Sequence, residues 1–159
     1  MLYVLCGPSY CGKSTYAEKL KNHISAHGTN VTIVNPDSIR EEVFGDAGKQ
    51  DQGYIIFQIA YGRVEEALAR GDIVIFDATS LTPRARKPLI NIARKYKTMV
   101  VAITFKDLSM AEFVERYAAR ERRVPIEIVG KQRQKFTLPT RAEGFDRVWK
   151  AEEYYDTLH

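Results

Sequence analysis

The sequence predicts an α/β fold in which a central parallel sheet is covered by helices on both faces. Three observations support this fold class. Short apolar runs, among them 2–6, 73–76 and 99–105, alternate along the chain with longer segments of helical periodicity. Within these runs apolar residues follow one another directly, which is typical of strands buried on both faces. A glycine-rich turn joins the first run to the first helical segment, as in βα units.

That turn has the spacing of a phosphate-binding loop. It fits Gly-x-x-x-x-Gly-Lys-Ser/Thr. Gly7 and Gly12 allow backbone angles and close approaches with which successive N–H groups line one concavity. Lys13 can then reach the β- and γ-phosphates, while the Ser14 hydroxyl ligates Mg²⁺. We therefore expect a nucleoside triphosphate to be held by Gly7, Pro8, Ser9, Tyr10, Cys11, Gly12, Lys13, Ser14 and Thr15.

Length and composition indicate one globular domain spanning residues 1–159. The chain is 45% hydrophobic and 28% charged, and no apolar run has the length that a membrane span needs. We therefore expect no membrane partner and a cytoplasmic location. Cys6 and Cys11 are interpreted as reduced thiols, because a disulfide between them would distort the loop.

Positive charge is concentrated in the second half of the chain. Residues 84–147 contain 16 Lys and Arg against 7 Asp and Glu, whereas the rest contains 8 against 13. Clustered positive charge suits phosphate-rich ligands, either a nucleotide alone or a nucleotide together with a nucleic-acid strand. An ordinary solvated surface is the structural alternative.

The elements that follow the loop are predicted from periodicity and stop signals. An apolar stripe predicts a helix over 14–26, and the β-branched run 31–34 predicts a strand that is buried if the sheet is parallel. Residues 46–53 are polar and glycine-rich, which indicates a loop. A second apolar stripe predicts a long helix over 53–70, ended by Gly71.

Asp37 and Arg40 lie one turn apart at the start of another predicted helix. Asn35 as N-cap and Pro36 at the first helical position place this turn at the carboxyl end of a strand, where open α/β sheets bind ligands. Asp37 can accept the proton of an attacking hydroxyl, and Arg40 can hold an anionic group of the same substrate. Alternatively, Asp37 complements the helix dipole and Arg40 is a surface residue.

Asp77 and the basic residues after it are further candidates. Asp77 ends the predicted strand 73–77 as a Walker B aspartate does, which places it near Mg²⁺; an aspartate that binds turn amides is the alternative. Thr82 caps the helix predicted over 83–96, whose first two turns carry Arg84, Arg86 and Lys87 against the helix dipole. Because such a placement suits an anion, Thr79, Arg84 and Arg86 are predicted to bind substrate.

An arginine-rich segment follows the strand predicted over 99–105. Arg116, Arg120 and Arg123 recur at helical spacing within 109–125. We expect this segment to be a lid that closes on the nucleotide and brings guanidinium groups to the transferring phosphoryl group. A solvated helix face is the alternative. A helix over 125–136 and a last strand over 145–149 complete the predicted elements.

These motifs together resemble the P-loop kinase domain of polynucleotide 5′-hydroxyl kinases, within the wider adenylate-kinase-like group. The resemblance covers nearly the whole chain and rests on residues 7–15, Asn35-x-Asp37-x-x-Arg40, residues 77–90 and Glu115-Arg116-x-x-x-Arg120. It implies a three-layer P-loop NTPase fold with an Arg-rich lid, ATP and Mg²⁺ as cofactors, and a DNA or RNA strand with a 5′-hydroxyl as substrate.

The resemblance also implies roles for single residues. Lys13 and Ser14 look like the phosphate and Mg²⁺ residues, and Asp37 looks like the general base. Arg40 resembles the clamp on the adjacent substrate phosphate, Arg120 the lid arginine, and Thr79 a substrate-strand contact. Ser80 departs from the family, whose members often have Asn there. A phosphatase or ligase segment is not indicated, so the chain corresponds to the kinase half.

Two other functions remain open at this stage. The same parts suit a kinase of a small hydroxylated metabolite, either a nucleoside or a sugar. A nucleotide-dependent switch without transfer chemistry is a third reading, although the sequence has no Asn/Thr-Lys-x-Asp motif for guanine. The P-loop fold serves all three classes of protein.

Overall fold

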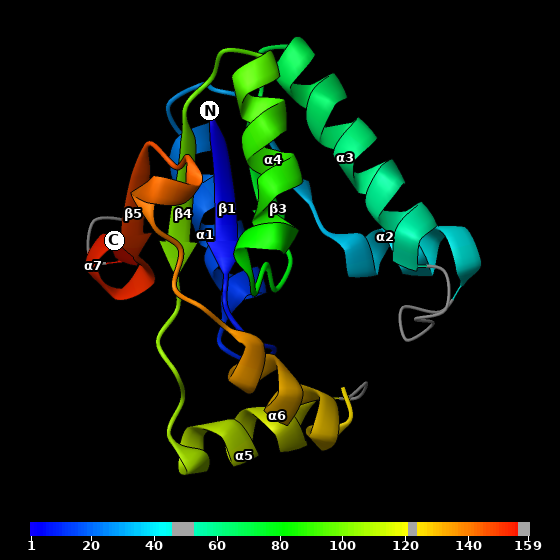
Figure 1. Ribbon diagram of the computed structural model, residues 1–159, viewed down its shortest axis with the longest axis vertical. Helices are drawn as coiled ribbons and strands as arrows, with labels where there is room; N and C mark the ends of the chain where they lie inside the picture. Colours follow the sequence, from blue (N-terminus) through cyan, green and yellow to red (C-terminus); the bar gives the residue numbers. More distant parts are fainter. Residues whose placement is uncertain (46–52, 121–123, 156–159) are drawn as a thin grey trace.

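A five-stranded parallel sheet forms the centre of the molecule (Figure 1). The computed structural model describes residues 1–45, 53–120 and 124–155. The strand order is β2-β3-β1-β4-β5, and every neighbouring pair is parallel. The strands are β1 (Leu2–Cys6), β2 (Val31–Val34), β3 (Ile73–Asp77), β4 (Val100–Thr104) and β5 (Arg147–Lys150). This arrangement confirms the predicted parallel sheet.

Helices cover both faces of this sheet, because side chains along each strand point alternately to opposite sides. Leu2 and Val4 of β1 pack in one cluster with α3 (Gly53–Ala69) and α4 (Pro83–Lys95). Tyr3 and Leu5 pack in the other cluster with α1 (Lys13–Ser25) and with Ala151 at the start of α7 (Ala151–Tyr155). The three predicted layers are therefore present, and α1, α3 and α4 begin and end within one residue of their expected bounds.

Strand β2 differs from the expectation of burial. Three of its four residues are only half-buried, because β2 forms one edge of the sheet and has β3 as its single strand neighbour. In contrast, all five residues of β4 are buried, as predicted. Helix α2 (Pro36–Phe44) follows β2, and its N-cap is the predicted one: Asn35 Oδ1 accepts the N–H groups of Asp37 at 2.9 Å and Ser38 at 3.3 Å.

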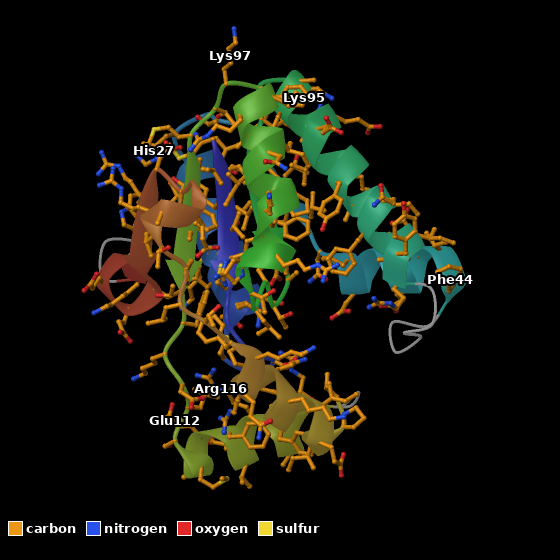
Figure 2. All side chains as sticks on the ribbon, in the orientation of Figure 1. His27, Phe44, Lys95, Lys97, Glu112 and Arg116 are labelled. Carbon is orange, nitrogen blue, oxygen red and sulfur yellow. The ribbon has the colours of Figure 1, made fainter. Side chains whose placement is uncertain are left out.

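Two helices, α5 (Met110–Ala119) and α6 (Ile126–Lys135), lie beyond the carboxyl ends of the strands (Figure 1). We call them the α5–α6 pair. Figure 2 shows Glu112 and Arg116 of α5 at one end of the molecule and Lys95 and Lys97 at the other. The predicted arginine stripe is wrong for Arg120, because α5 ends at Ala119 and Arg120 has an extended backbone, with φ −88° and ψ 132°.

The remaining segments complete the carboxyl-terminal part. A short 3₁₀ turn, η1 (Arg141–Glu143), precedes β5. Arg123 and most of the loop predicted over 46–53 lie outside the described residues. Cys6 and Cys11 are free thiols. Among the helices of the described ranges, none combines the length and apolarity needed to cross a bilayer.

Candidate active site

The loop between β1 and α1 requires glycine at both of its motif positions. At Gly7 a Cβ atom would lie 2.9 Å from Cys11 Sγ and 3.3 Å from Phe105 Cβ. At Gly12, which has φ +96°, it would lie 3.2 Å from an Arg116 guanidinium nitrogen. Side chains are excluded from both places, so the loop backbone approaches its neighbours closely, as in loops that bind phosphate groups.

Lys13 is folded back onto this loop. Its Nζ donates to the carbonyl of Pro8 at 2.6 Å and lies 3.5 Å from Cys11 Sγ. The side chain is 8% exposed, so the ammonium group is held within the loop instead of extending into solvent. Burial raises the pKa of the Cys11 thiol, and the charge of Lys13 opposes this shift. Cys11 is therefore a neutral thiol at physiological pH.

Ser14 and Asp77 meet at the carboxyl ends of β1 and β3. Asp77 Oδ2 accepts from Ser14 Oγ at 2.8 Å and from Asn35 Nδ2 at 3.2 Å. Burial raises the pKa of Asp77, and the hydrogen bond from Ser14 and the charge of Lys13 oppose this shift. A hydroxyl and a carboxylate side by side are the oxygen ligands that Mg²⁺ prefers. The donors therefore fit the predicted ion.

Asp37 points into the site and does not cap its own helix, because Asn35 makes the cap. Its Oδ1 accepts from Arg40 Nη1 at 2.6 Å. The Asp37 side chain is 57% exposed, whereas the Arg40 side chain is 5% exposed. Arg40 Nε is buried without a hydrogen-bond partner among the described residues. Arg40 thus orients the carboxylate, and its role as a phosphate clamp stays a prediction.

A small pocket of about 90 Å³ brings the predicted catalytic groups together. Asp37 of α2 shares this pocket with Lys13 and Ser14 of α1. The same pocket is lined by Ser9, Tyr10, Gly12, Asn35, Asp77, Ala78, Thr79, Arg120 and Val124. A carboxylate, an ammonium group and a guanidinium group therefore surround one space at the carboxyl edge of the sheet, where ligands of α/β folds bind.

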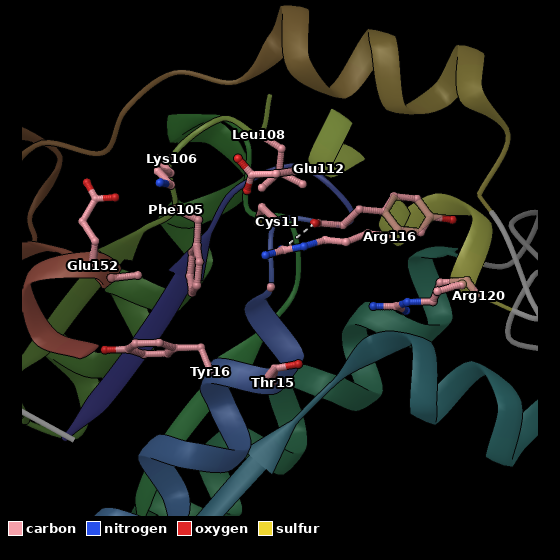
Figure 3. Close-up of a pocket in the computed structure, with 14 residues that line it drawn as sticks. Cys11, Thr15, Tyr16, Phe105, Lys106, Leu108, Glu112, Arg116, Arg120 and Glu152 are labelled. Atoms are coloured by element: carbon pink, nitrogen blue, oxygen red, sulfur yellow. Dashed lines mark hydrogen bonds between the residues drawn. The ribbon is translucent and has the colours of Figure 1, made fainter. Parts of the chain in front are cut away.

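A second, larger pocket of about 510 Å³ adjoins the small one and is shown in Figure 3. Its volume falls within the range of small-molecule and cofactor sites. In Figure 3, Arg116 and Arg120 stand on one side of this pocket and Phe105, Lys106 and Glu152 on the other. The two pockets share Tyr10, Gly12 and Arg120. A nucleotide can therefore place its base and ribose in the larger pocket and its terminal phosphate in the smaller one.

Tyr10 connects the phosphate-binding loop to the α5–α6 pair. Its ring packs with Phe113 and Tyr117, at centroid distances of 5.8 Å and 5.4 Å. Its hydroxyl accepts the Val124 N–H at 2.8 Å, and its carbonyl accepts from Arg116 Nη1 at 3.0 Å. The Arg120 guanidinium lies over the same ring at 5.4 Å. The helix pair is thus built around a side chain of the loop.

Comparison with known proteins places this geometry in a family. The family model AAA_33, described as an AAA domain, matches residues 2–139. The chain belongs to this family. The match and the parallel sheet together confirm the predicted P-loop NTPase fold. The finer resemblance to polynucleotide 5′-hydroxyl kinases stays a prediction.

Three proteins similar to this AAA_33 chain are informative. L-seryl-tRNA(Sec) kinase of Methanococcus maripaludis is 27% identical over 145 residues, which are 87% of this chain and 53% of that protein. The chain therefore spans about half the length of that relative. Chaetomium thermophilum Kti12, solved with ADP-AlF3, has a TM-score of 0.75 at 15% identity and full coverage of both chains. A chain of the Pnkp1/Rnl/Hen1 complex has a TM-score of 0.60 at 26% identity, covering 79% of this chain and 42% of that one.

The prediction that Arg86 binds substrate is wrong for this structure. Arg86 has no exposed surface, and its guanidinium pairs with Glu143 at 2.8 Å and 3.0 Å. It also donates to the carbonyls of Ser80 at 2.9 Å and Thr137 at 3.0 Å. Arg86 therefore joins three segments of the AAA_33 chain. Arg84 is exposed on the first turn of α4, and its substrate role stays a prediction.

Sequence reasoning missed one side of the larger pocket. Phe105 and Lys106 directly follow β4, and Ala151 and Glu152 directly follow β5. All four line the pocket because the carboxyl ends of parallel strands meet at one edge of the sheet. The sequence carries a signal for them, because the rule that places Asp37 and Arg40 at the carboxyl end of a strand applies equally to residues after the last two strands. Glu112 has no comparable signal, because its position depends on how the α5–α6 pair packs.

Proposed function

We propose that this protein transfers the γ-phosphoryl group of ATP to the 5′-hydroxyl of a DNA or RNA strand. One observation carries the proposal: Asp37 shares a pocket with Lys13 and Ser14. A carboxylate within reach of the terminal phosphate is the group that an alcohol-accepting kinase needs as a base. A nucleotide-dependent switch has no such requirement.

In the proposed reaction Asp37 takes the proton of the acceptor hydroxyl while the new bond forms between that oxygen and the γ-phosphorus. The bond from the γ-phosphorus to the β–γ bridging oxygen breaks, and ADP leaves. Lys13 and Arg120 stabilise the charge on the transferring group. Mg²⁺ held by Ser14 and Asp77 would neutralise the negative charge on the β- and γ-phosphate oxygens when bound. Arg40 keeps the Asp37 carboxylate in place.

The comparisons support an acceptor carried by nucleic acid. One relative is, by its name, a kinase of L-seryl-tRNA, and another similar chain belongs to the Pnkp1/Rnl/Hen1 complex. The excess of Lys and Arg over residues 84–147 agrees with a phosphate-rich partner. These features favour a strand over a free sugar or nucleoside, which offers no phosphate for the excess positive charge.

Substitution of the proposed base tests the reaction. Asp37→Asn should lower transfer by about 10²–10⁴-fold. Nucleotide binding should change little, because the loop and Lys13 are intact. Transfer is measured with γ-labelled ATP and a 5′-hydroxyl oligonucleotide, and binding is measured by titration with ADP. A wild-type rate in Asp37→Asn would show that Asp37 is not the base.

Glu41→Gln is the matched control, because Glu41 lies exposed on the same helix and lines neither pocket. It should retain wild-type transfer. Thermal denaturation of both variants separates loss of chemistry from loss of folding, since Asp37→Asn leaves the buried Arg40 without its carboxylate partner. Nucleosides and sugars assayed beside the oligonucleotides identify the acceptor class.

A further inference from the structure

A third pocket adjoins the catalytic pocket. It has a volume of about 210 Å³ and shares Thr79 with the catalytic pocket. Its volume lies below the range of sites for drug-sized ligands, so it suits one ring system and not a whole nucleotide. The residues that line it are Phe57, Phe76, Ser80, Leu81, Thr82, Ala85 and Lys135, in addition to Thr79. No role in the reaction described above involves this pocket.

Aromatic rings form one part of this pocket. Phe57 of α3 and Phe76 of β3 both line it. They belong to a row of three rings, because Tyr61 lies 5.9 Å from Phe57 and stacks on Phe76 at 6.1 Å. Phe57 is only half-buried, so its ring has surface available to a ligand. Stacking on an aromatic side chain is a common way to bind an unpaired nucleobase, whichever base it is.

The backbone beside these rings is fixed by its surroundings. Ser80 has φ +45°, a conformation that residues other than glycine rarely adopt, and it is buried. Its carbonyl accepts from Arg86 at 2.9 Å, and the carbonyl of Leu81 accepts the Thr137 N–H at 3.0 Å. The pocket is therefore preformed, which lowers the entropic cost of binding a ring in it.

Positively charged side chains lie at this pocket and on the adjoining turns of α4. Lys135 lines it, and Arg84 and Lys87 are exposed in the first two turns of α4, next to the lining residues Thr82 and Ala85. Within the described ranges no carboxylate pairs with Lys135, Arg84 or Lys87. The first turn of α4 has no acidic residue, so the positive end of its dipole adds to the same field. Such a cluster binds phosphate groups.

The geometry points to a pocket for the terminal nucleobase of the acceptor strand. The base stacks against Phe57, and the 5′-hydroxyl of the same nucleotide reaches Asp37 past Thr79. Phosphates of the same strand contact Lys135, Arg84 and Lys87. This inference rests on the proposed function and makes it narrower. A nucleic-acid end satisfies both the ring pocket and the cations, whereas a sugar satisfies neither and a nucleoside only the first.

Two oligonucleotides that differ only in the terminal base test the inference with the wild-type protein. One strand has an intact 5′-hydroxyl nucleotide, and the other has an abasic residue with the same 5′-hydroxyl. The abasic strand should show a KM at least about fivefold higher, the loss expected for one stacked base, with a smaller change in kcat. DNA and RNA versions of both strands show which of the two nucleic acids is the acceptor.

The outcomes separate this inference from the proposed function. If neither strand is labelled, the proposed function fails, and this inference fails with it. If both strands are labelled with equal kcat/KM, the protein phosphorylates nucleic-acid strands, but the pocket does not bind the terminal base. If the intact strand is favoured through KM, the inference is supported.

Variants of the pocket make the same test from the protein side. Phe57→Leu keeps an apolar side chain against the core but removes the ring. The ratio of kcat/KM for the base-bearing strand to that for the abasic strand should therefore fall toward one. Tyr54→Leu is the control, because Tyr54 is an exposed aromatic residue on the same helix and lines none of the three pockets. An unchanged preference in Phe57→Leu would overturn the stacking contact.

A lysine pair tests the phosphate contacts. Lys135→Gln should reduce by about one the slope of log affinity against log salt concentration, as expected for the loss of one phosphate contact. Lys97→Gln should leave this slope unchanged, because Lys97 is exposed at the opposite end of the molecule (Figure 2). Equal slopes for Lys135→Gln and wild type would exclude Lys135 from the strand contact.

Discussion

At Asp77, burial and ligand binding have opposite effects on the ionisation of the carboxyl group. Burial raises the pKa of this carboxyl above its ordinary value of 3.8, so its ionisation costs more in the folded protein than in water. Its hydrogen bonds from Ser14 and Asn35 offset only part of that cost. A divalent cation beside Ser14 would lower the pKa of Asp77 again, because the cation favours the charged carboxylate.

The pH dependence of stability follows from the direction of this shift. A group with a raised folded-state pKa stabilises the fold below its unfolded pKa and loses that contribution as pH rises through the folded-state pKa. Asp77→Asn removes the charge and keeps an oxygen acceptor for Ser14. The variant without nucleotide should therefore be more stable than wild type above neutral pH, and the difference should shrink toward pH 4. Thermal denaturation across this range is the measurement.

Added Mg²⁺ and nucleotide should make wild type more stable than Asp77→Asn, the reverse of the order without ligand. Wild type should gain more in Tm than Asp77→Asn, because only wild type retains the carboxylate ligand. An Asp77→Asn variant that is less stable than wild type by the same amount at every pH would contradict the assignment of burial as the dominant effect.

Among the elements, the α5–α6 pair depends most visibly on a residue outside itself. Its small apolar cluster contains Phe113 and Val129 from the two helices and Tyr10 from the phosphate-binding loop. Gln132 of α6 also accepts the Ser9 N–H at 2.8 Å. The helix pair and the loop therefore behave as one packed unit, and a change in the loop reaches the helices directly.

Removal of either side of this contact should loosen the helix pair. Tyr10→Ala should increase proteolytic cleavage in the α5–α6 segment and lower transfer, because it deletes a ring and the hydroxyl that accepts from Val124. Truncation of a buried aromatic ring costs about 3–5 kcal/mol. Phe113→Ala is the matched variant, since it deletes the facing ring and leaves the loop sequence intact. Similar cleavage of both variants supports the contact, and wild-type resistance in both would contradict it.

The sequence predicted the elements of this fold well because each has local signals. Asn35 and Thr82 cap their helices as expected, and Thr82 Oγ1 accepts the Ala85 N–H. Two features were not predictable from local patterns. The edge position of β2 depends on strand order, and the end of α5 at Ala119 depends on how the chain turns toward α6. The helical spacing of the arginines, taken alone, extends the predicted helix through Arg120.

At the scale of the whole molecule, Arg86 and Glu143 connect parts of the chain that are distant in sequence. The guanidinium and carboxylate form two hydrogen bonds, at 2.8 Å and 3.0 Å; the Arg86 side chain is fully buried, and the Glu143 side chain is 12% exposed. Glu143 also accepts the Thr140 N–H, which fixes the 3₁₀ turn. Basic residues at a helix start suggested an anionic substrate, but the anion for Arg86 is a carboxylate of the same chain.

Breaking this pair should be costly. Glu143→Gln leaves the Arg86 charge buried without a counter-charge, which should lower the free energy of unfolding by about 3–5 kcal/mol. Glu65→Gln is the control, because its partner Lys95 is largely exposed and the loss of a surface pair changes stability little. Urea denaturation of both variants measures the difference. Equal unfolding free energies would show that the Arg86 charge is compensated by other groups.

The position of Glu143 also sets a limit on how the protein can be shortened. A truncated version ending after α6 would retain the nucleotide loop, the proposed base and all three pockets' lining residues except those of α7. It would nevertheless enclose a permanently charged side chain in its interior with no anion to match it. We therefore expect a stable catalytic fragment to extend past residue 143, even though that turn lines none of the three pockets.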